Sequence, residues 1–212
     1  MKDFDPTLYF ITDSTPYTEE EFLFRVEQAV AGGVTLIQLR EKNRTTREYI
    51  HLAQSVHELA RQYAIPLIID DRIDVAQAVK SEGVHLGQSD MPIQTARSIL
   101  GSSFIIGATT KTVPQALEAY KQGADYCGVG AIYPTTTKVK TVLTSTNTLS
   151  DICEAVPIPV NAIGGLNKTN LSVLEGIKIS GICVVSAIMH AANPKQEAQT
   201  LLTLAKKLVQ RE

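Results

Sequence analysis

The chain has 212 residues, of which 44% are hydrophobic, so it can bury the core of one α/β domain spanning residues 1–212. Its formal net charge is −2 and its pI is about 6.1. Without a basic surplus, nucleic acid and anionic membranes are disfavoured as main partners, and any anionic ligand must be bound by local groups.

Short apolar segments, typical of buried strands, alternate along the chain with amphipathic segments that are typical of helices. The expected strands cover 8–11, 34–39, 67–69, 83–87, 104–110, 126–132, 159–165 and 181–187. The expected helices cover 19–31, 46–63, a short segment from Asp74, 92–100, 113–122, 149–155, 171–177 and the chain from Pro194 onward.

This alternation occurs eight times with no linker or break in composition. Eight successive βα units in one domain of this length predict a single (β/α)₈ TIM barrel. A doubly wound open sheet is the alternative, and it is disfavoured because such sheets usually have fewer strands. In a barrel, the loops that follow the strands meet at one face, which is where active sites lie.

Carboxylates cluster at the end of the third expected strand. Asp70 and Asp71 follow an apolar run, and Asp90 follows the next strand. Parallel strands of one βαβ unit end on the same side of a sheet, so Asp71 and Asp90 are expected at one rim, where they could hold a cation. The alternative is that Asp74 and Asp90 simply cap helices or turns. Asp70 and Asp71 fit that alternative less well, because adjacent carboxylates repel.

Polar and basic side chains share one face of the second expected strand. Period-two alternation places Gln38, Arg40 and Lys42 together, opposite Ile37 and Leu39. Loops after strands seven and eight commonly bind phosphate in barrels, which makes the stretches around Gly165 and Ser186 a second candidate anion site. Acidic groups beside basic ones suit a Mg²⁺ ion that bridges carboxylates to a polyphosphate.

A long polar loop follows the sixth expected strand and carries Lys138. A loop of this length is often a lid over a site. The three cysteines, Cys127, Cys153 and Cys183, lack metal-type spacing, which favours reduced thiols in a cytoplasmic protein. The sequence near Met1 shows no apolar signal segment, and no run is apolar and long enough to cross a bilayer.

These motifs together resemble the thiamine-phosphate synthase family. The matching stretches occur in order along nearly the whole chain and cover 38–42, 69–72, 83–91, 128–130 with 133–138, 162–165 and 184–187. The resemblance implies a TIM-barrel transferase of thiamine biosynthesis that joins hydroxymethylpyrimidine diphosphate to a thiazole phosphate. The products are thiamine phosphate and pyrophosphate, and the reaction is expected to use Mg²⁺ and a cation-like pyrimidine species.

The resemblance also implies a role for each matching residue. The pyrimidine diphosphate would contact Gln38, Leu39, Arg40, Glu41, Lys42, Asp70, Thr109 and Lys138, and the thiazole phosphate would contact Thr135, Thr136, Thr137, Gly165, Val185 and Ser186. Asp71 and Asp90 would bind Mg²⁺. Arg40, Lys42 and Lys138 would stabilise the leaving diphosphate, with no general base required.

The chain departs from the family pattern in two places, and the loop after Lys138 also lacks the family's usual charged and glycine-containing continuation. The family usually has Asn where this chain has Asp70, and a different triplet where it has Thr109-Thr110-Lys111. Two other functions are alternatives to the synthase. A thiazole tautomerase would share the barrel but lack the full Gln-x-Arg-x-Lys stripe and the two metal aspartates, and a non-catalytic phosphate sensor would not need the Mg²⁺ ligands. The presence of both features in this sequence favours the synthase.

Overall fold

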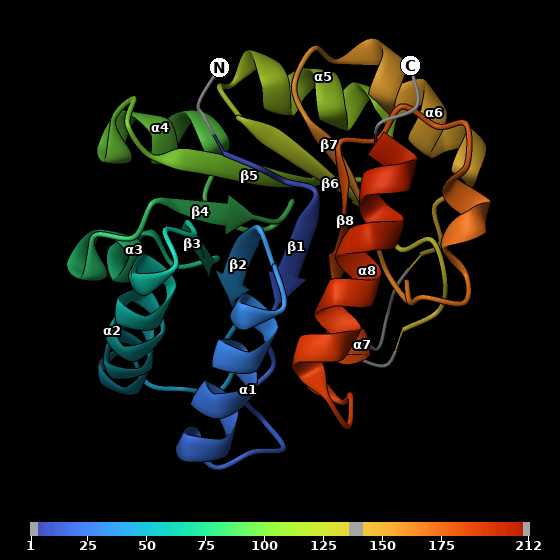
Figure 1. Cartoon of the computed structure of the whole chain (residues 1–212). Helices are drawn as coiled ribbons and strands as arrows, with labels where there is room; N and C mark the ends of the chain where they lie inside the picture. Colours follow the sequence, from blue (N-terminus) through green and yellow to red (C-terminus); the bar gives the residue numbers. More distant parts are fainter. Residues whose placement is uncertain (1–3, 136–141, 210–212) are drawn as a thin grey trace.

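The computed structural model describes residues 4–135 and 142–209. Eight parallel strands close into a barrel in sequential order, with β1 paired to both β2 and β8 (Figure 1). This closure confirms the predicted (β/α)₈ fold and excludes the open sheet.

The strands are short, and most of their residues are buried. They are β1 (Leu8–Ile11), β2 (Leu36–Leu39), β3 (Leu67–Asp70), β4 (Gly83–Leu86), β5 (Ile105–Thr110), β6 (Tyr126–Gly130), β7 (Val160–Ile163) and β8 (Gly181–Val184). The helices are α1 (Glu19–Ala31), α2 (Thr46–Gln62), α3 (Ile73–Val79), α4 (Ile93–Leu100), α5 (Val113–Lys121), α6 (Thr146–Ala155), the 3₁₀ helix η1 (Leu171–Leu174), α7 (Ser186–Met189) and α8 (Pro194–Val209).

Local sequence signals explain where several helices begin. Thr45 and Glu48 form a reciprocal capping box at the start of α2. Ser145 accepts a hydrogen bond from the Thr148 amide, so α6 begins three residues before the expected Leu149. Helix α1 ends at Gly32-Gly33, where Gly33 adopts a φ of +99° that favours glycine.

Two expected segments differ from the structure after β7. The expected helix over 171–177 is only the four-residue η1, because Asn167 and Asn170 form side-chain bonds to the neighbouring backbone, which compete with helix formation. The expected strand over 181–187 ends at Val184, and α7 begins at Ser186. Strand β1 has the expected bounds, and the boundaries of β2 to β7 differ from expectation by at most two residues.

The core has two layers, as the period-two pattern of the strands requires. Inward-facing side chains fill the barrel, and they include Tyr9, Ile11, Leu36, Ile68, Ile105, Tyr126 and Cys183. Outward-facing side chains such as Ile37, Leu39 and Val84 pack against the surrounding helices. This pattern places Gln38 and Asp70 on the inner face, in phase with Leu36 and Ile68.

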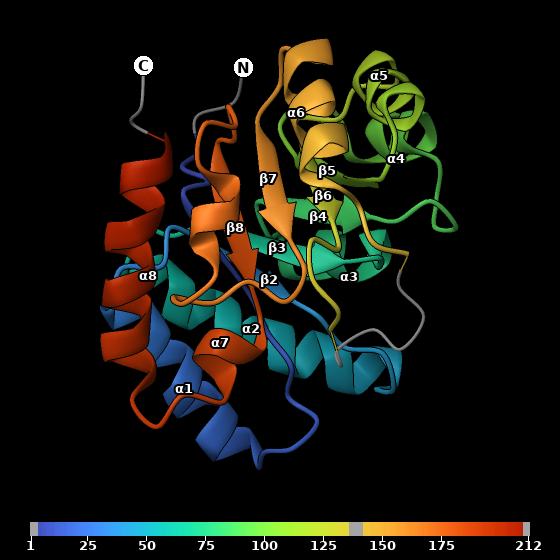
Figure 2. The same cartoon turned by 90° about the vertical axis from the view of Figure 1, so that its right-hand side faces the viewer.

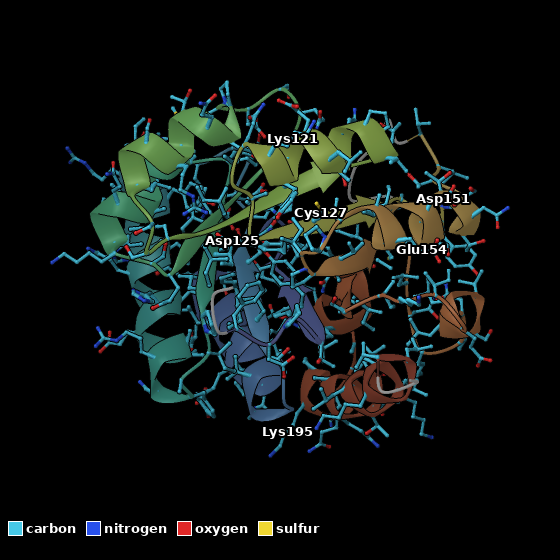
Figure 3. The ribbon with its side chains drawn as sticks, turned by 90° about the horizontal axis from the view of Figure 1, so that it is seen from above. Lys121, Asp125, Cys127, Asp151, Glu154 and Lys195 are labelled. Carbon is cyan, nitrogen blue, oxygen red and sulfur yellow. The ribbon has the colours of Figure 1, made fainter. Side chains whose placement is uncertain are left out.

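The helices form an outer ring around the strands. Figure 2 shows β7 and β8 running in the same direction, with α7 beyond the end of β8. In Figure 3, Cys127 of β6 lies inside the layer of helices that carries the exposed Lys121, Asp151 and Glu154. All three cysteines are free thiols. Among the described residues, no helix is long and apolar enough to span a membrane.

Candidate active site

Charged side chains meet where β2, β3 and β4 end. The Lys42 ammonium lies 2.6 Å from Asp70 Oδ2 and also donates a short hydrogen bond to Asp71 Oδ2. Arg40 Nε lies 3.9 Å from the same oxygen of Asp70. The structure therefore brings together the basic face of β2 and the carboxylates of β3.

Asp71 is held in an unusual backbone conformation. Its φ is +60°, in the left-handed region that non-glycine residues rarely adopt, and its amide donates to the His85 carbonyl at 2.9 Å. Such a conformation costs on the order of 1 kcal/mol and is concentrated at functional sites. The pairing with β4 thus aims the Asp71 carboxylate toward the loop that carries Asp90.

Asp90 is fixed by the turn after β4. Its Oδ2 accepts a hydrogen bond of 2.7 Å from the Gly87 amide, and a Cβ added at Gly87 would lie 2.8 Å from that oxygen. The Asp90 side chain also shares a hydrogen bond with that of Asp71. Burial and this bond raise the pKa of Asp90 above its usual value.

The pKa values of Asp70 and Asp71 shift in opposite directions. Burial, together with the Asp71 charge, raises the pKa of Asp70 to about 6, although Lys42 opposes the shift. Burial also acts to raise the pKa of Asp71, but the hydrogen bond and charge of Lys42 outweigh it and hold that pKa below its usual value. Burial acts to lower the pKa of Lys42, but its two carboxylate partners outweigh it, so that pKa is raised. The two neighbouring carboxyl groups of Asp70 and Asp71 therefore favour sharing one proton or binding one cation.

Two members of the 38–42 stretch turn away from the rim. The Leu39 side chain is buried in the outer core, so only its backbone can reach a ligand in the barrel mouth. Glu41 Oε2 accepts hydrogen bonds from Ser14 Oγ at 2.8 Å and Arg44 Nε at 3.1 Å. Burial raises the pKa of Glu41. Glu41 thus joins the loop after β1 to the loop after β2.

Gln38 and Thr109 form hydrogen bonds with side chains inside the barrel. Gln38 Nε2 donates to Tyr9 Oη at 2.7 Å, and Thr109 Oγ1 lies 2.9 Å from His85 Nε2. Tyr9, His85 and Tyr126 were not singled out by the sequence analysis. Their inward positions on apolar strands are the signal that could have identified them.

The second candidate anion site lies at the ends of β6, β7 and β8. Gly164 and Gly165 have φ values of +104° and +65°. A Cβ on Gly165 would lie 2.7 Å from Tyr133 Cβ, so glycine is needed where the two loops cross. Val185 and Ser186 follow β8, and Thr135 is half-buried in the loop after β6. Thr136, Thr137 and Lys138 lie outside the described residues.

Asp74 serves local structure and does not join the cluster. Its carboxylate pairs with the Arg72 guanidinium at 2.5 Å and accepts hydrogen bonds from the backbone at the start of α3. The Arg72 bond and charge hold the pKa of Asp74 below its usual value, although burial acts in the opposite direction. The capping interpretation is therefore correct for Asp74.

The chain is similar to known proteins along most of its length. A family model described as thiamine monophosphate synthase matches residues 8–188. Thiamine-phosphate synthase 2 of Streptococcus pneumoniae (strain TIGR4) is 48% identical over 195 residues, which is 92% of this chain and 93% of that protein. The thiamine-phosphate synthase of Methanobrevibacter smithii is 45% identical over 202 residues, with 95% and 96% of the two chains covered.

A solved structure extends the similarity to three dimensions. The thiamine phosphate pyrophosphorylase from Pyrococcus furiosus superimposes with a TM-score of 0.88 at 38% identity, covering 97% of this chain and 98% of that one. Sequence, fold and the order of the motifs agree over nearly the full length. The chain therefore belongs to the thiamine-phosphate synthase family.

Proposed function

We propose that this barrel, acting as one catalytic domain over residues 1–212, joins hydroxymethylpyrimidine diphosphate to a thiazole phosphate and releases pyrophosphate. The observation that carries the proposal is the meeting of Arg40 and Lys42 with three aspartates at the rim. Its relatives bear the name of an enzyme that makes thiamine phosphate. The three free thiols fit a cytoplasmic setting.

In this proposal, the end of β2 binds the diphosphate. Arg40 and Lys42 provide positive charge, and Lys138 would add a third charge from the loop after β6. These cations stabilise the negative charge that grows on the leaving diphosphate as the C–O bond breaks. Because the thiazole nitrogen can capture the resulting pyrimidine cation directly, no general base is needed. Gln38, Asp70 and Thr109 would face the pyrimidine.

The donor set at Asp71 and Asp90 fits a magnesium ion. The described residues contain no group of three or more His, Cys, Asp or Glu side chains that could hold a metal. Mg²⁺ does not need such a group, since it commonly takes one or two carboxylates and completes its shell with water and substrate phosphate oxygens. When bound there, it would neutralise diphosphate charge. The Asp71 and Asp90 carboxyl groups interact closely enough for each to shift the pKa of the other, which supports the proposal that they act on one ion.

The thiazole phosphate would bind on the opposite side of the rim. The residues assigned to it are Thr135, Thr136, Thr137, Gly165, Val185 and Ser186. The support is that Gly165, Val185 and Ser186 follow β7 and β8, where barrels commonly bind phosphate. In this proposal, the two substrates would bind on facing sides of one barrel mouth.

The experiment is an assay with both substrates and Mg²⁺ that measures pyrophosphate and thiamine phosphate. Wild type should form both products, and excess chelator should abolish their formation. Asp71→Ala and Asp90→Ala should each lower kcat/KM by about 10- to 100-fold or more, as loss of metal support typically does.

Asp74→Ala is the matched control, because its carboxylate lies in the first turn of α3 and pairs with Arg72. It should keep wild-type turnover. If wild type released no pyrophosphate, the synthase assignment would be wrong. Full turnover by Asp71→Ala or Asp90→Ala would exclude the metal assignment alone.

A further inference from the structure

A chain of hydrogen bonds crosses the interior of the barrel below the charged rim. Gln38 Nε2 lies 2.7 Å from Tyr9 Oη, which lies 2.7 Å from Tyr126 Oη. Tyr126 Oη lies 3.0 Å from His85 Nδ1, and His85 Nε2 lies 2.9 Å from Thr109 Oγ1. This hydrogen-bond chain therefore connects β2, β1, β6, β4 and β5. Its two ends, Gln38 and Thr109, are residues proposed to face the pyrimidine.

The interior is shaped to hold this chain. Tyr9 and Tyr126 are at most 1% exposed, and their rings meet edge to face with centroids 5.7 Å apart. A Cβ added at Gly107 would lie 2.1 Å from Tyr126 Cζ and 2.5 Å from His85 Nδ1. The absence of a side chain at Gly107 thus leaves the space in which the tyrosine meets the imidazole.

The proton on each hydroxyl group can be assigned from one end of the chain. Gln38 donates through its amide nitrogen, so Tyr9 accepts that bond and must direct its own proton elsewhere. Among the residues described in the structure, the remaining hydrogen-bond partner of Tyr9 Oη is Tyr126 Oη. Tyr126 then accepts from Tyr9 and donates its own proton to His85 Nδ1.

This direction fixes the tautomer of the imidazole. A neutral His85 that accepts at Nδ1 carries its proton on Nε2 and donates it to Thr109 Oγ1. Because the Thr109 hydroxyl accepts this hydrogen bond from His85, its own proton is available to a partner in the barrel mouth. Burial raises the pKa of both tyrosines well above the usual value, so both remain donors at neutral pH.

We propose that Tyr9 and Tyr126 are positioning residues, which hold His85 in the Nε2–H tautomer so that the Thr109 hydroxyl is a hydrogen-bond donor to the pyrimidine diphosphate. The identity of this ligand rests on the proposed function. The tautomer does not, because the hydrogen bonds that set it lie wholly within the protein.

The first test measures the tautomer in the free protein. In protein with ¹⁵N-labelled histidine, couplings to the ring protons identify which nitrogen of each imidazole is protonated, and a His85→Asn variant assigns the signal. Wild type should show Nε2–H at His85. A proton on Nδ1 would reverse the direction of the whole chain and overturn the proposal.

The second test removes one hydroxyl group. Tyr126→Phe should lower the Nε2–H population of His85 and reduce kcat by about tenfold, the lower end of what losing an orienting partner costs. Tyr49→Phe is the matched control, because it removes a buried hydroxyl of α2 that donates to the Leu39 carbonyl and is not part of the hydrogen-bond chain. It should leave the His85 tautomer unchanged.

The possible outcomes separate this proposal from the proposed function. An unchanged His85 tautomer in folded Tyr126→Phe would refute the positioning role. If Tyr126→Phe does not fold, Tyr9→Phe gives the same test one bond further along the chain. A wild-type protein with the expected tautomer but no pyrophosphate release would refute the synthase reaction and leave the hydrogen-bond direction intact.

Discussion

The carboxyl group of Asp70 is buried beside two cations and a second carboxyl group. It is 7% exposed, and its pKa is raised to about 6 despite the ion pair with Lys42. Burial and the neighbouring Asp71 therefore outweigh the attraction of the ammonium group. An asparagine, which the family resemblance favours here, would avoid that cost and could both donate to and accept from an aminopyrimidine.

This balance predicts how stability depends on pH. The raised pKa means that the folded state binds the Asp70 proton more tightly than the unfolded chain, whose Asp pKa is about 4. The stability from that proton is fully present below about pH 4 and is lost as the pH rises through about 6. Asp70→Asn has no such loss. Its free energy of unfolding relative to wild type should rise by about 2–3 kcal/mol between these pH values.

Urea unfolding of both proteins in chelator, at several pH values between 4 and 7, measures this difference. Asp151→Asn, a substitution on the exposed face of α6, is the matched control. A difference between Asp70→Asn and wild type that stays constant across this range would show that Asp70 ionises in the folded protein as it does in the unfolded chain.

At the scale of elements, α2 fixes the spacing of the two strands that carry the charged cluster. Tyr49 on α2 is 1% exposed, and its hydroxyl donates to the Leu39 carbonyl at 2.7 Å, with the Asp70 carbonyl 3.3 Å away. These are the last residues of β2 and β3. One phenol group thus joins both strand ends directly before the chain turns into Arg40 and Asp71.

Removal of this hydroxyl should loosen both strand ends. Tyr49→Phe should lower the free energy of unfolding by about 1–2 kcal/mol, since it removes a buried hydrogen bond and leaves a carbonyl without its donor. Tyr120→Phe is the control, because Tyr120 is 44% exposed. Equal urea midpoints for the two variants would mean that the Tyr49 bond adds no net stability.

The sequence predicted elements well where periodicity is strong and poorly where side chains compete with the backbone. The two faces of β2 followed from the alternation of Gln38 and Arg40 with Ile37 and Leu39, and Ile37 and Leu39 indeed pack in the outer core. The short η1 did not follow, because Asn167 and Asn170 form local bonds that an apolar pattern does not reveal.

The same limit applies to the site. The approach of Lys42 to Asp70 and Asp71 could be anticipated, because parallel strands end together. The hydrogen-bond chain through Tyr9 and Tyr126 could not be anticipated. These two residues are 117 positions apart, and only the closure of the barrel brings their hydroxyl groups together.

At the scale of the whole molecule, the two ends of the barrel have different tasks. The candidate active site lies at the carboxyl ends of the strands. The opposite end is closed by Phe4, whose ring packs 5.6 Å from that of Tyr126, and by Asn161, whose Nδ2 donates to the Pro6 carbonyl at 2.7 Å. Gly181 allows this closure, since its Cβ would lie only 1.9 Å from the same carbonyl oxygen.

This division predicts that stability and catalysis can be changed separately. Asn161 is fully buried, so Asn161→Ala should leave the Pro6 carbonyl unsatisfied and lower the free energy of unfolding by about 1–3 kcal/mol. Because residues at the amino-terminal end of a barrel mainly serve stability, kcat and KM measured well below the melting temperature should match those of wild type. Thermal unfolding paired with the pyrophosphate assay makes the comparison. A fall in kcat with an unchanged melting temperature would show that the two ends are coupled through the interior, and the buried hydrogen-bond chain would then be the first connection to test.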